Sequence, residues 1–125
     1  MEKKDVQERL KSLGYECKNT DDYMLGFAMQ AAKQHICNIA NIRDVPEELS
    51  TLAVDMAAGE FLCAARTAGT LAGEEIEQIE RSIKEGDTSV EYAEDMTPSQ
   101  RIDAYINHMR FGREQEIYAF RRMTW

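Results

Sequence analysis

Apolar residues recur at three- and four-residue steps along most of the chain, which is the spacing of one face of an α-helix. Val6, Leu10 and Leu13 predict a first helix over about residues 3–13, and Gly14 follows where a left-handed C-cap commonly lies. A longer helix over about 21–40 is predicted by residues that recur at four-residue steps, namely Tyr23, Met24, Phe27, Ala28 and Ala31.

Two further helices have clear start signals. Pro46 is tolerated in a first helical turn, and Glu47 and Glu48 suit the positive end of a helix, so we expect a third helix over about 46–67. The sequence from Thr97 to Gln100 has the form of a capping box with proline at the first position. It predicts a fourth helix over about 98–119, whose inner face holds Ile102, Tyr105, Ile106 and Met109.

The segment before this last helix is ambiguous. Ile76, Ile79 and Ile83 suit a helix, but the residues around Gly86 form a turn signal, and residues 88–92 alternate as a half-buried strand does. We therefore predict a strand-turn-strand element over about 79–92. The expected fold is mainly α: a small bundle of about four helices with this hairpin-like element before the last one.

Composition and charge place this bundle among ordinary globular proteins. A length of 125 residues, 43% of them apolar and 30% charged, predicts one domain over residues 1–125. The net charge of −8 is uneven: residues 1–100 carry 10 basic against 20 acidic side chains, whereas the last 25 residues carry five arginines against three acids. An acidic body with a basic end favours head-to-tail self-association, although the asymmetry is also compatible with chance on a solvated surface.

Cysteine usage and hydropathy bear on the compartment. Cys17, Cys37 and Cys63 are far apart and odd in number, which argues against a disulfide framework and favours a reducing compartment. No apolar run reaches the length of a signal peptide core or of the ~20 residues of a membrane helix. We expect an intracellular protein that does not enter a membrane.

The sequence gives little support to catalysis or to a cofactor. His35 and Cys37 would point to different sides of a helix, which disfavours a shared metal ion, and no nucleotide-binding motif accompanies the turn at Gly86. A nucleophilic Cys37 or Cys63 with His108 as base is a pairing that arises by chance in many chains. We predict no enzyme activity, no metal and no cofactor.

The chain end from Tyr118 to Trp125 is crowded with aromatic residues and arginines, the residue types that anchor protein interfaces. It favours a partner surface, and the alternative is that Trp125 packs back on its own bundle. Together with the Ile83-to-Val90 segment around Gly86-Asp87-Thr88, and with the helix that opens at Pro46, this end resembles the head-tail connector proteins of tailed phages. These are also called head-completion or DNA-packaging proteins and occur in prophages of low-GC Gram-positive bacteria.

The resemblance implies a structural role in virion assembly. Such a protein forms a ring of identical subunits between the portal protein and a tail or stopper protein, and it continues the channel through which genomic DNA passes without sequence-specific binding. It would be made in the host bacterial cytoplasm and end in the neck of the virion. Carried over by position, the subunit or portal contacts would involve Gly86, Asp87, Thr88, Arg121, Arg122, Met123 and Trp125.

A helical DNA-binding regulator of a phage is the alternative function. It would share the small helical size, but its recognition helix should be basic. The second and third predicted helices and their loop carry only Lys33, Arg43 and Arg66 as cations, and the clustered arginines fall at the chain end. A small enzyme using cysteine or carboxylates is a second, weaker alternative.

Overall fold

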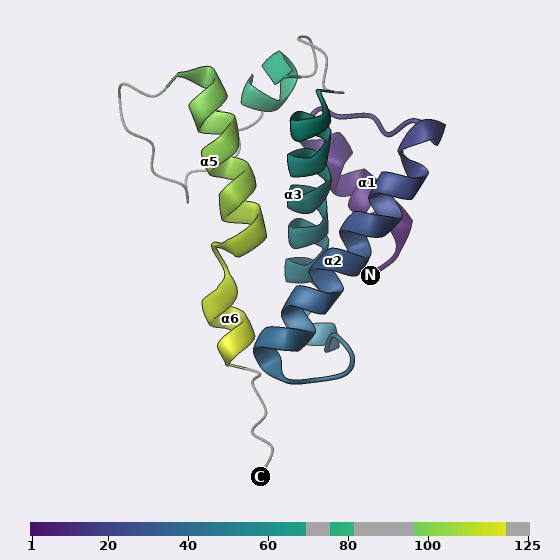
Figure 1. Cartoon of the computed structure of the whole chain (residues 1–125), viewed down its shortest axis with the longest axis vertical. Coiled ribbons are helices and arrows are strands. Elements are labelled where there is room, and N and C mark those ends of the chain that lie inside the picture. The colour runs from purple at the N-terminus through teal and green to yellow at the C-terminus, as the bar shows by residue number, and fades with distance from the viewer. Residues whose placement is uncertain (70–75, 82–96, 120–125) are drawn as a thin grey trace.

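A computed structural model describes residues 1–69, 76–81 and 97–119, and the described chain is a bundle of helices (Figure 1). The mainly helical class is therefore confirmed. Short 3-10 turns at Asn19–Asp21 and Glu47–Leu49 lead into two of the helices. The helices are α1 (Lys3–Ser12), α2 (Asp22–Ala40), α3 (Ser50–Ala68), α5 (Pro98–Phe111) and α6 (Glu114–Tyr118).

Helix α3 is the centre of the bundle. It contacts α1, α2 and α5, and Figure 1 shows it between α5 and the pair formed by α1 and α2. Its buried residues include several with small side chains, which let neighbouring helices approach closely. At Gly59, a Cβ atom would lie 2.9 Å from Met109 Cβ and 3.2 Å from the Arg110 backbone nitrogen. The contact between α3 and α5 therefore requires glycine at this position.

The link between α1 and α2 is anchored by an aromatic pair. Gly14 has φ of +92°, and this left-handed residue turns the chain so that the Tyr15 amide donates to the Leu10 carbonyl at 3.0 Å. Tyr15 is thereby buried against Phe61 of α3, with ring centroids 5.4 Å apart. Its hydroxyl donates to Asp21 Oδ2 at 2.8 Å. The left-handed residue expected at Gly14 is thus present.

The predicted start of the last helix is also present. The Gln100 amide donates to Thr97 Oγ1 at 3.2 Å, and the Thr97 amide donates to Gln100 Oε1 at 3.0 Å. This reciprocal pair satisfies two amides that the first turn of a helix leaves without an intrahelical acceptor.

Two predictions about the second half of the chain need correction. Residues 79–81 are helical, as part of a helical stretch over 76–81, so the proposed first strand is wrong there; Ile79 is buried in this helix. The hydrophobic period of Ile76 and Ile79 was the better guide than the turn signal after it. The remainder of the predicted strand-turn-strand element, residues 82–92, lies outside the described residues.

The single helix predicted over 98–119 is two helices. Helix α5 ends at Phe111, and Arg113 has φ of −113° and ψ of 21°, which interrupts the helical path before α6. A Cβ atom at Gly112 would meet the ring and carbonyl of His108, so glycine permits the tight turn there. The apolar pattern did not reveal the break because Ile117 remains fully buried after it.

Candidate functional site

The residues predicted to make subunit or portal contacts all lie outside the described residues. They are Gly86, Asp87, Thr88, Arg121, Arg122, Met123 and Trp125. Their assignment stays a prediction. The described residues do locate the other arginines of the basic chain end, as well as the cysteines and histidines considered as candidate chemistry.

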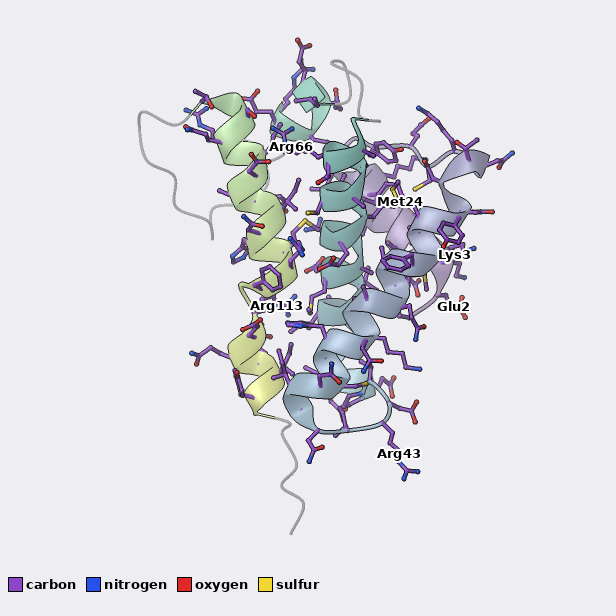
Figure 2. The ribbon with its side chains drawn as sticks, viewed as in Figure 1. Glu2, Lys3, Met24, Arg43, Arg66 and Arg113 are labelled. Atoms are coloured by element: carbon purple, nitrogen blue, oxygen red, sulfur yellow. The ribbon has the colours of Figure 1, made fainter. Side chains whose placement is uncertain are left out.

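Three of the five arginines at the basic end form ion pairs within the chain. Arg110 Nε lies 2.8 Å from Glu60 Oε1, and both side chains are about three-quarters buried. Arg101 Nη1 lies 3.7 Å from Glu80 Oε1. Arg113 Nη1 lies 3.0 Å from Asp55 Oδ2 and therefore ties the junction of α5 and α6 to α3 (Figure 2). These three arginines therefore stabilise contacts between elements of the bundle.

Asp55 accepts hydrogen bonds from two arginines that are far apart in the sequence. Arg9 of α1 donates from Nε to Asp55 Oδ1 at 2.7 Å, and Arg113 donates to the other carboxylate oxygen. Arg9 also donates from Nη2 to the Tyr105 hydroxyl of α5 at 3.2 Å. A single carboxylate on the central helix thus joins α1 to the segment between α5 and α6.

The pKa values around this centre agree with the geometry. Burial by itself lowers the pKa of Arg9, but the hydrogen bond and the negative charge of Asp55 more than offset it, so the net pKa is raised. The pKa of Arg113 is raised chiefly by its hydrogen bond to Glu116. The same hydrogen bond lowers the pKa of Glu116. These groups favour their charged forms, as expected of structural ion pairs.

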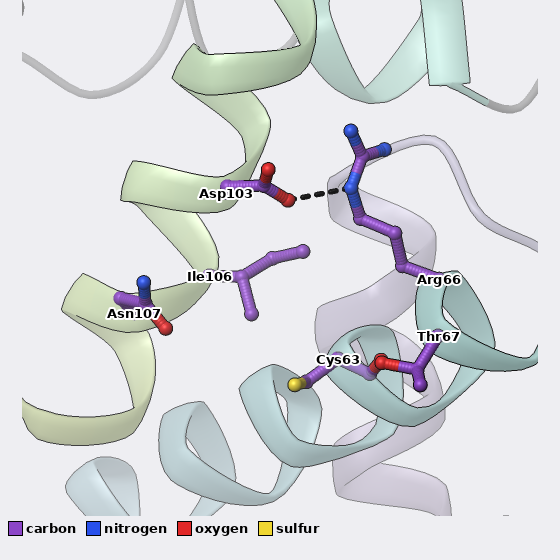
Figure 3. A pocket seen from close by; sticks show the side chains of 6 residues that line it. All are labelled: Cys63, Arg66, Thr67, Asp103, Ile106 and Asn107. Carbon is purple, nitrogen blue, oxygen red and sulfur yellow. Dashed lines mark hydrogen bonds and ion pairs between the residues drawn. The ribbon is translucent and has the colours of Figure 1, made fainter.

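A pocket of about 310 Å³ lies between α3 and α5 (Figure 3). Arg66 reaches across its upper part, where its Nε lies 2.5 Å from Asp103 Oδ1 and its Nη2 donates to Ser99. The lining residues are Cys63, Arg66, Thr67, Asp103, Ile106 and Asn107. The guanidinium and the carboxylate face one another, so the pocket offers a ligand a neutralised ion pair rather than an unbalanced charge.

Cys17 and Cys37 are poor candidates for a nucleophile. The pKa of Cys37 is raised, mainly by burial, and so is that of Cys17, where Asp21 and Asp22 add to the effect of burial. A raised pKa leaves less of the reactive thiolate at neutral pH. Cys63 lies beside Arg110, whose Nη1 is 3.3 Å from the sulfur.

His35, which was considered with Cys37 as a ligand of a metal ion, makes contacts within the helical bundle. Its Nε2 lies 3.0 Å from Glu114 Oε1, and its ring meets the edge of Phe111 with centroids 5.6 Å apart. It thereby links α2 to the region where α5 ends and α6 begins. Within residues 1–69, 76–81 and 97–119, no group of three or more His, Cys, Asp or Glu side chains is placed to hold a metal ion. None of the helices in these ranges is long and apolar enough to cross a membrane.

The outer face of α2 is a surface that the sequence reasoning missed. Tyr23 is 85% exposed and Phe27 is 66% exposed, the two highest values among the large apolar side chains of the described chain. Gln30 and Gln34 continue the same stripe and are also exposed. Here we call these four residues the α2 face. Aromatic side chains without neighbouring charge are typical of the centre of a protein interface.

The sequence contained a signal for this face. Tyr23 and Phe27 belong to the repeat that predicts this helix, but the core packs against a different stripe. That stripe is the one buried in the bundle, and it consists of Leu25, Ala28, Ala32 and Ile36. The bundle therefore buries one stripe of α2 and leaves Tyr23 and Phe27 outside it.

Comparison with known proteins gives no relative for this arrangement. No family model, no curated protein sequence and no solved structure matches the chain.

Proposed function

We propose that the protein is a structural phage protein, a head-tail connector that forms a ring between the portal and the tail. In this role it completes the head and continues the DNA channel, and it binds copies of itself, the portal protein and a tail or stopper protein. The genome passes through the ring without sequence-specific binding. The proposal starts from the sequence resemblance, and the ion pairs of the basic chain end sharpen it.

The observation that carries the proposal is the use of the arginines in the last 25 residues. Arg101, Arg110 and Arg113 pair with carboxylates of the same chain. Their side chains are about a quarter to a third exposed, so a neighbouring molecule has limited access to them. Arg121 and Arg122 are therefore the arginines of this segment that we assign to intersubunit or portal contacts.

A ring is compatible with the distribution of charge. One heterologous contact, repeated around a rotation axis until it closes, needs two different complementary patches on each subunit. Arg121 and Arg122 would supply the basic patch, and the acidic body, whose carboxylates outnumber its basic residues by two to one over residues 1–100, would supply the other. The excess of negative charge also suits a channel along which DNA slides without being held.

The DNA-binding regulator is less well supported. Of the cations on α2 and α3, Arg66 is bound to Asp103 at 2.5 Å, and Lys33 Nζ lies 3.8 Å from Asp44 Oδ1. A helix that reads duplex DNA needs cations directed at phosphates and base edges. Binding to duplex DNA that weakens steeply with salt would revive this alternative.

The test is a charge reversal at the chain end. The double substitution Arg121→Glu with Arg122→Glu should abolish assembly with the portal ring of the same phage, as measured by co-sedimentation and negative-stain electron microscopy. Lys4→Glu with Lys11→Glu is the matched control, because it makes the same change in charge at two exposed positions of α1. Both variants should keep the helical circular dichroism spectrum. Unimpaired assembly of the Arg121, Arg122 variant would contradict the proposal.

A further inference from the structure

Helix α2 carries far less charge than the neighbouring helix α1. Six of the ten residues of α1 are charged, whereas α2 has nineteen residues and, apart from His35, only Asp22 and Lys33 can carry a charge at neutral pH. Between those two residues lie ten uncharged ones, which include Tyr23 and Phe27. On this stretch of α2, another copy of a strongly acidic protein can approach without adding an excess of negative charge.

The two charged residues of α2 are placed symmetrically about its aromatic centre. Asp22 lies five residues before Phe27, and Lys33 lies six residues after it. They are eleven residues apart, which is about three helical turns, so they lie on the same flank of the helix. When two α2 helices run antiparallel about a two-fold axis near Phe27, Asp22 of each copy comes opposite Lys33 of the other.

The present partners of these residues leave them available. Lys3 Nζ lies 3.9 Å from Asp22 Oδ1, and Lys33 Nζ lies 3.8 Å from Asp44 Oδ1, with all four side chains at least 47% exposed. Exposed pairs at such distances hold their partners weakly. At each end of the antiparallel pair, two positive and two negative side chains would meet, which makes a neutral cluster.

The shape of the same flank permits a close approach. A Cβ atom built at Gly26 would meet nothing within 4 Å, so the backbone beside Phe27 faces open space. An aromatic side chain can therefore lie against the Gly26 backbone of another copy, while Phe27 lies near the two-fold axis. The protruding ring and the open position are on one surface, which makes that surface complementary to itself, as a two-fold interface requires.

We infer that the free protein forms an antiparallel two-fold dimer through the α2 face, with Asp22 of each copy paired to Lys33 of the other. This goes beyond the proposed ring. A closed ring repeats a contact between two different patches, whereas the α2 contact joins identical ones. The dimer is therefore the state of the free protein before it joins a larger assembly.

The expected affinity follows from the size of the contact. Buried aromatic residues contribute roughly 150–250 Å² each, so the four rings of the dimer supply on the order of 600 Å². Stable interfaces bury about 1,200 Å² or more, and the glutamines and the charged ends must provide the rest. The dimer lies at the small end of this range, and we expect a dissociation constant in the micromolar range.

The first experiment measures mass against concentration. Sedimentation velocity of the full chain across the micromolar range should give monomer passing to dimer. Tyr23→Ser with Phe27→Ser should raise the dissociation constant by about 100-fold, because these anchors enter the interface twice. Tyr118→Ser is the matched control, since Tyr118 is 52% exposed on α6 and its loss should leave the dimer unchanged. A wild-type chain that stays monomeric throughout would overturn the inference.

A charge exchange tests the antiparallel geometry. Asp22→Lys alone and Lys33→Asp alone should each weaken the dimer, because each places like charges opposite one another. The double variant with both substitutions should recover the wild-type affinity, since each end again has one acid and one base. Absence of this recovery, with circular dichroism unchanged, would refute the pairing. The Arg121, Arg122 variant should dimerise like the wild type, so failure of the ring and failure of the dimer are distinguishable.

Discussion

The junction between α3 and α5 and the outer face of α2 use side chains in opposite ways. At the junction, Arg66 pairs with Asp103 and Arg110 pairs with Glu60 across two tightly packed helices. On the α2 face, Tyr23 and Phe27 lie exposed with no charged residue between them. At this junction, paired charges join two helices of the same chain, whereas the α2 face exposes aromatic side chains that we propose as a contact with a second copy. The net charge of a segment therefore does not show which of its arginines pair within the chain.

The largest effect should come from removing the carboxylate that joins α1, α3 and the start of α6. Asp55→Ala leaves Arg9 and Arg113 without their shared acceptor at sites about one-third exposed. We expect the free energy of unfolding to fall by about 2 kcal/mol, less than for a fully buried pair because water partly solvates both arginines. Urea denaturation followed by circular dichroism measures this loss.

Asp55→Asn is the control for this prediction. It keeps the size of the side chain and one acceptor oxygen but removes the charge, so its loss of stability should be about half as large. Equal stabilities of the wild type and the alanine variant would mean that the ion pairs contribute nothing net, and the distinction between the two regions would be lost.

Alanine substitutions at two glycines within helices sharpen the comparison. They should change the free energy of unfolding in opposite directions. Gly59→Ala places a methyl group against Met109 and the Arg110 backbone, and overpacking there should cost about 1 kcal/mol even after the gain in helix propensity. Gly26→Ala meets nothing within 4 Å and should stabilise the monomer by up to about 1 kcal/mol. Thermal unfolding of both variants at low protein concentration tests this prediction. A change of the melting temperature in the same direction in both variants would contradict it.

The smallest effect concerns pH. The hydrogen bond from Arg113 lowers the pKa of Glu116 from its ordinary value of 4.5, so the folded state favours the carboxylate. The stability from this pair is complete above that ordinary value and is lost as the pH falls through the lower value of the folded state. Glu116→Gln should remove this part of the acid sensitivity of the melting temperature. A substitution on the α2 face should not alter how the melting temperature depends on pH, so Tyr23→Ser serves as the control.

Much of the fold could be predicted because it depends on local signals. The capping residues Thr97 and Gln100 and the left-handed Gly14 act within a few residues of the helix end they define. The break at Gly112 was not predicted, although the glycine is visible in the sequence, because glycine also occurs within helices. The contacts next to it, from Arg113 to Asp55 and from Glu114 to His35, join residues that are distant in sequence. The predicted strand at residues 79–81 failed because a turn signal beyond it outweighed the helical spacing of its isoleucines.

The pairing of charged side chains and the exposure of apolar ones could be predicted less well than the helices. The arginines of the chain end were counted by charge, and three of them proved to be occupied by Glu80, Glu60 and Asp55. The partner of a charged side chain is a property of the tertiary structure, so net charge cannot reveal it. For Tyr23 and Phe27, hydrophobicity alone cannot tell whether an apolar stripe faces the core or another molecule.

The double attachment at Asp55 also has a consequence for how the protein is made. Its two arginines are residues 9 and 113, so during synthesis Arg9 can reach Asp55 long before Arg113 has been made. The three N-terminal helices can associate as they emerge, with half of the Asp55 contact in place. The second half of the contact can form only after the segment between α5 and α6 has been made.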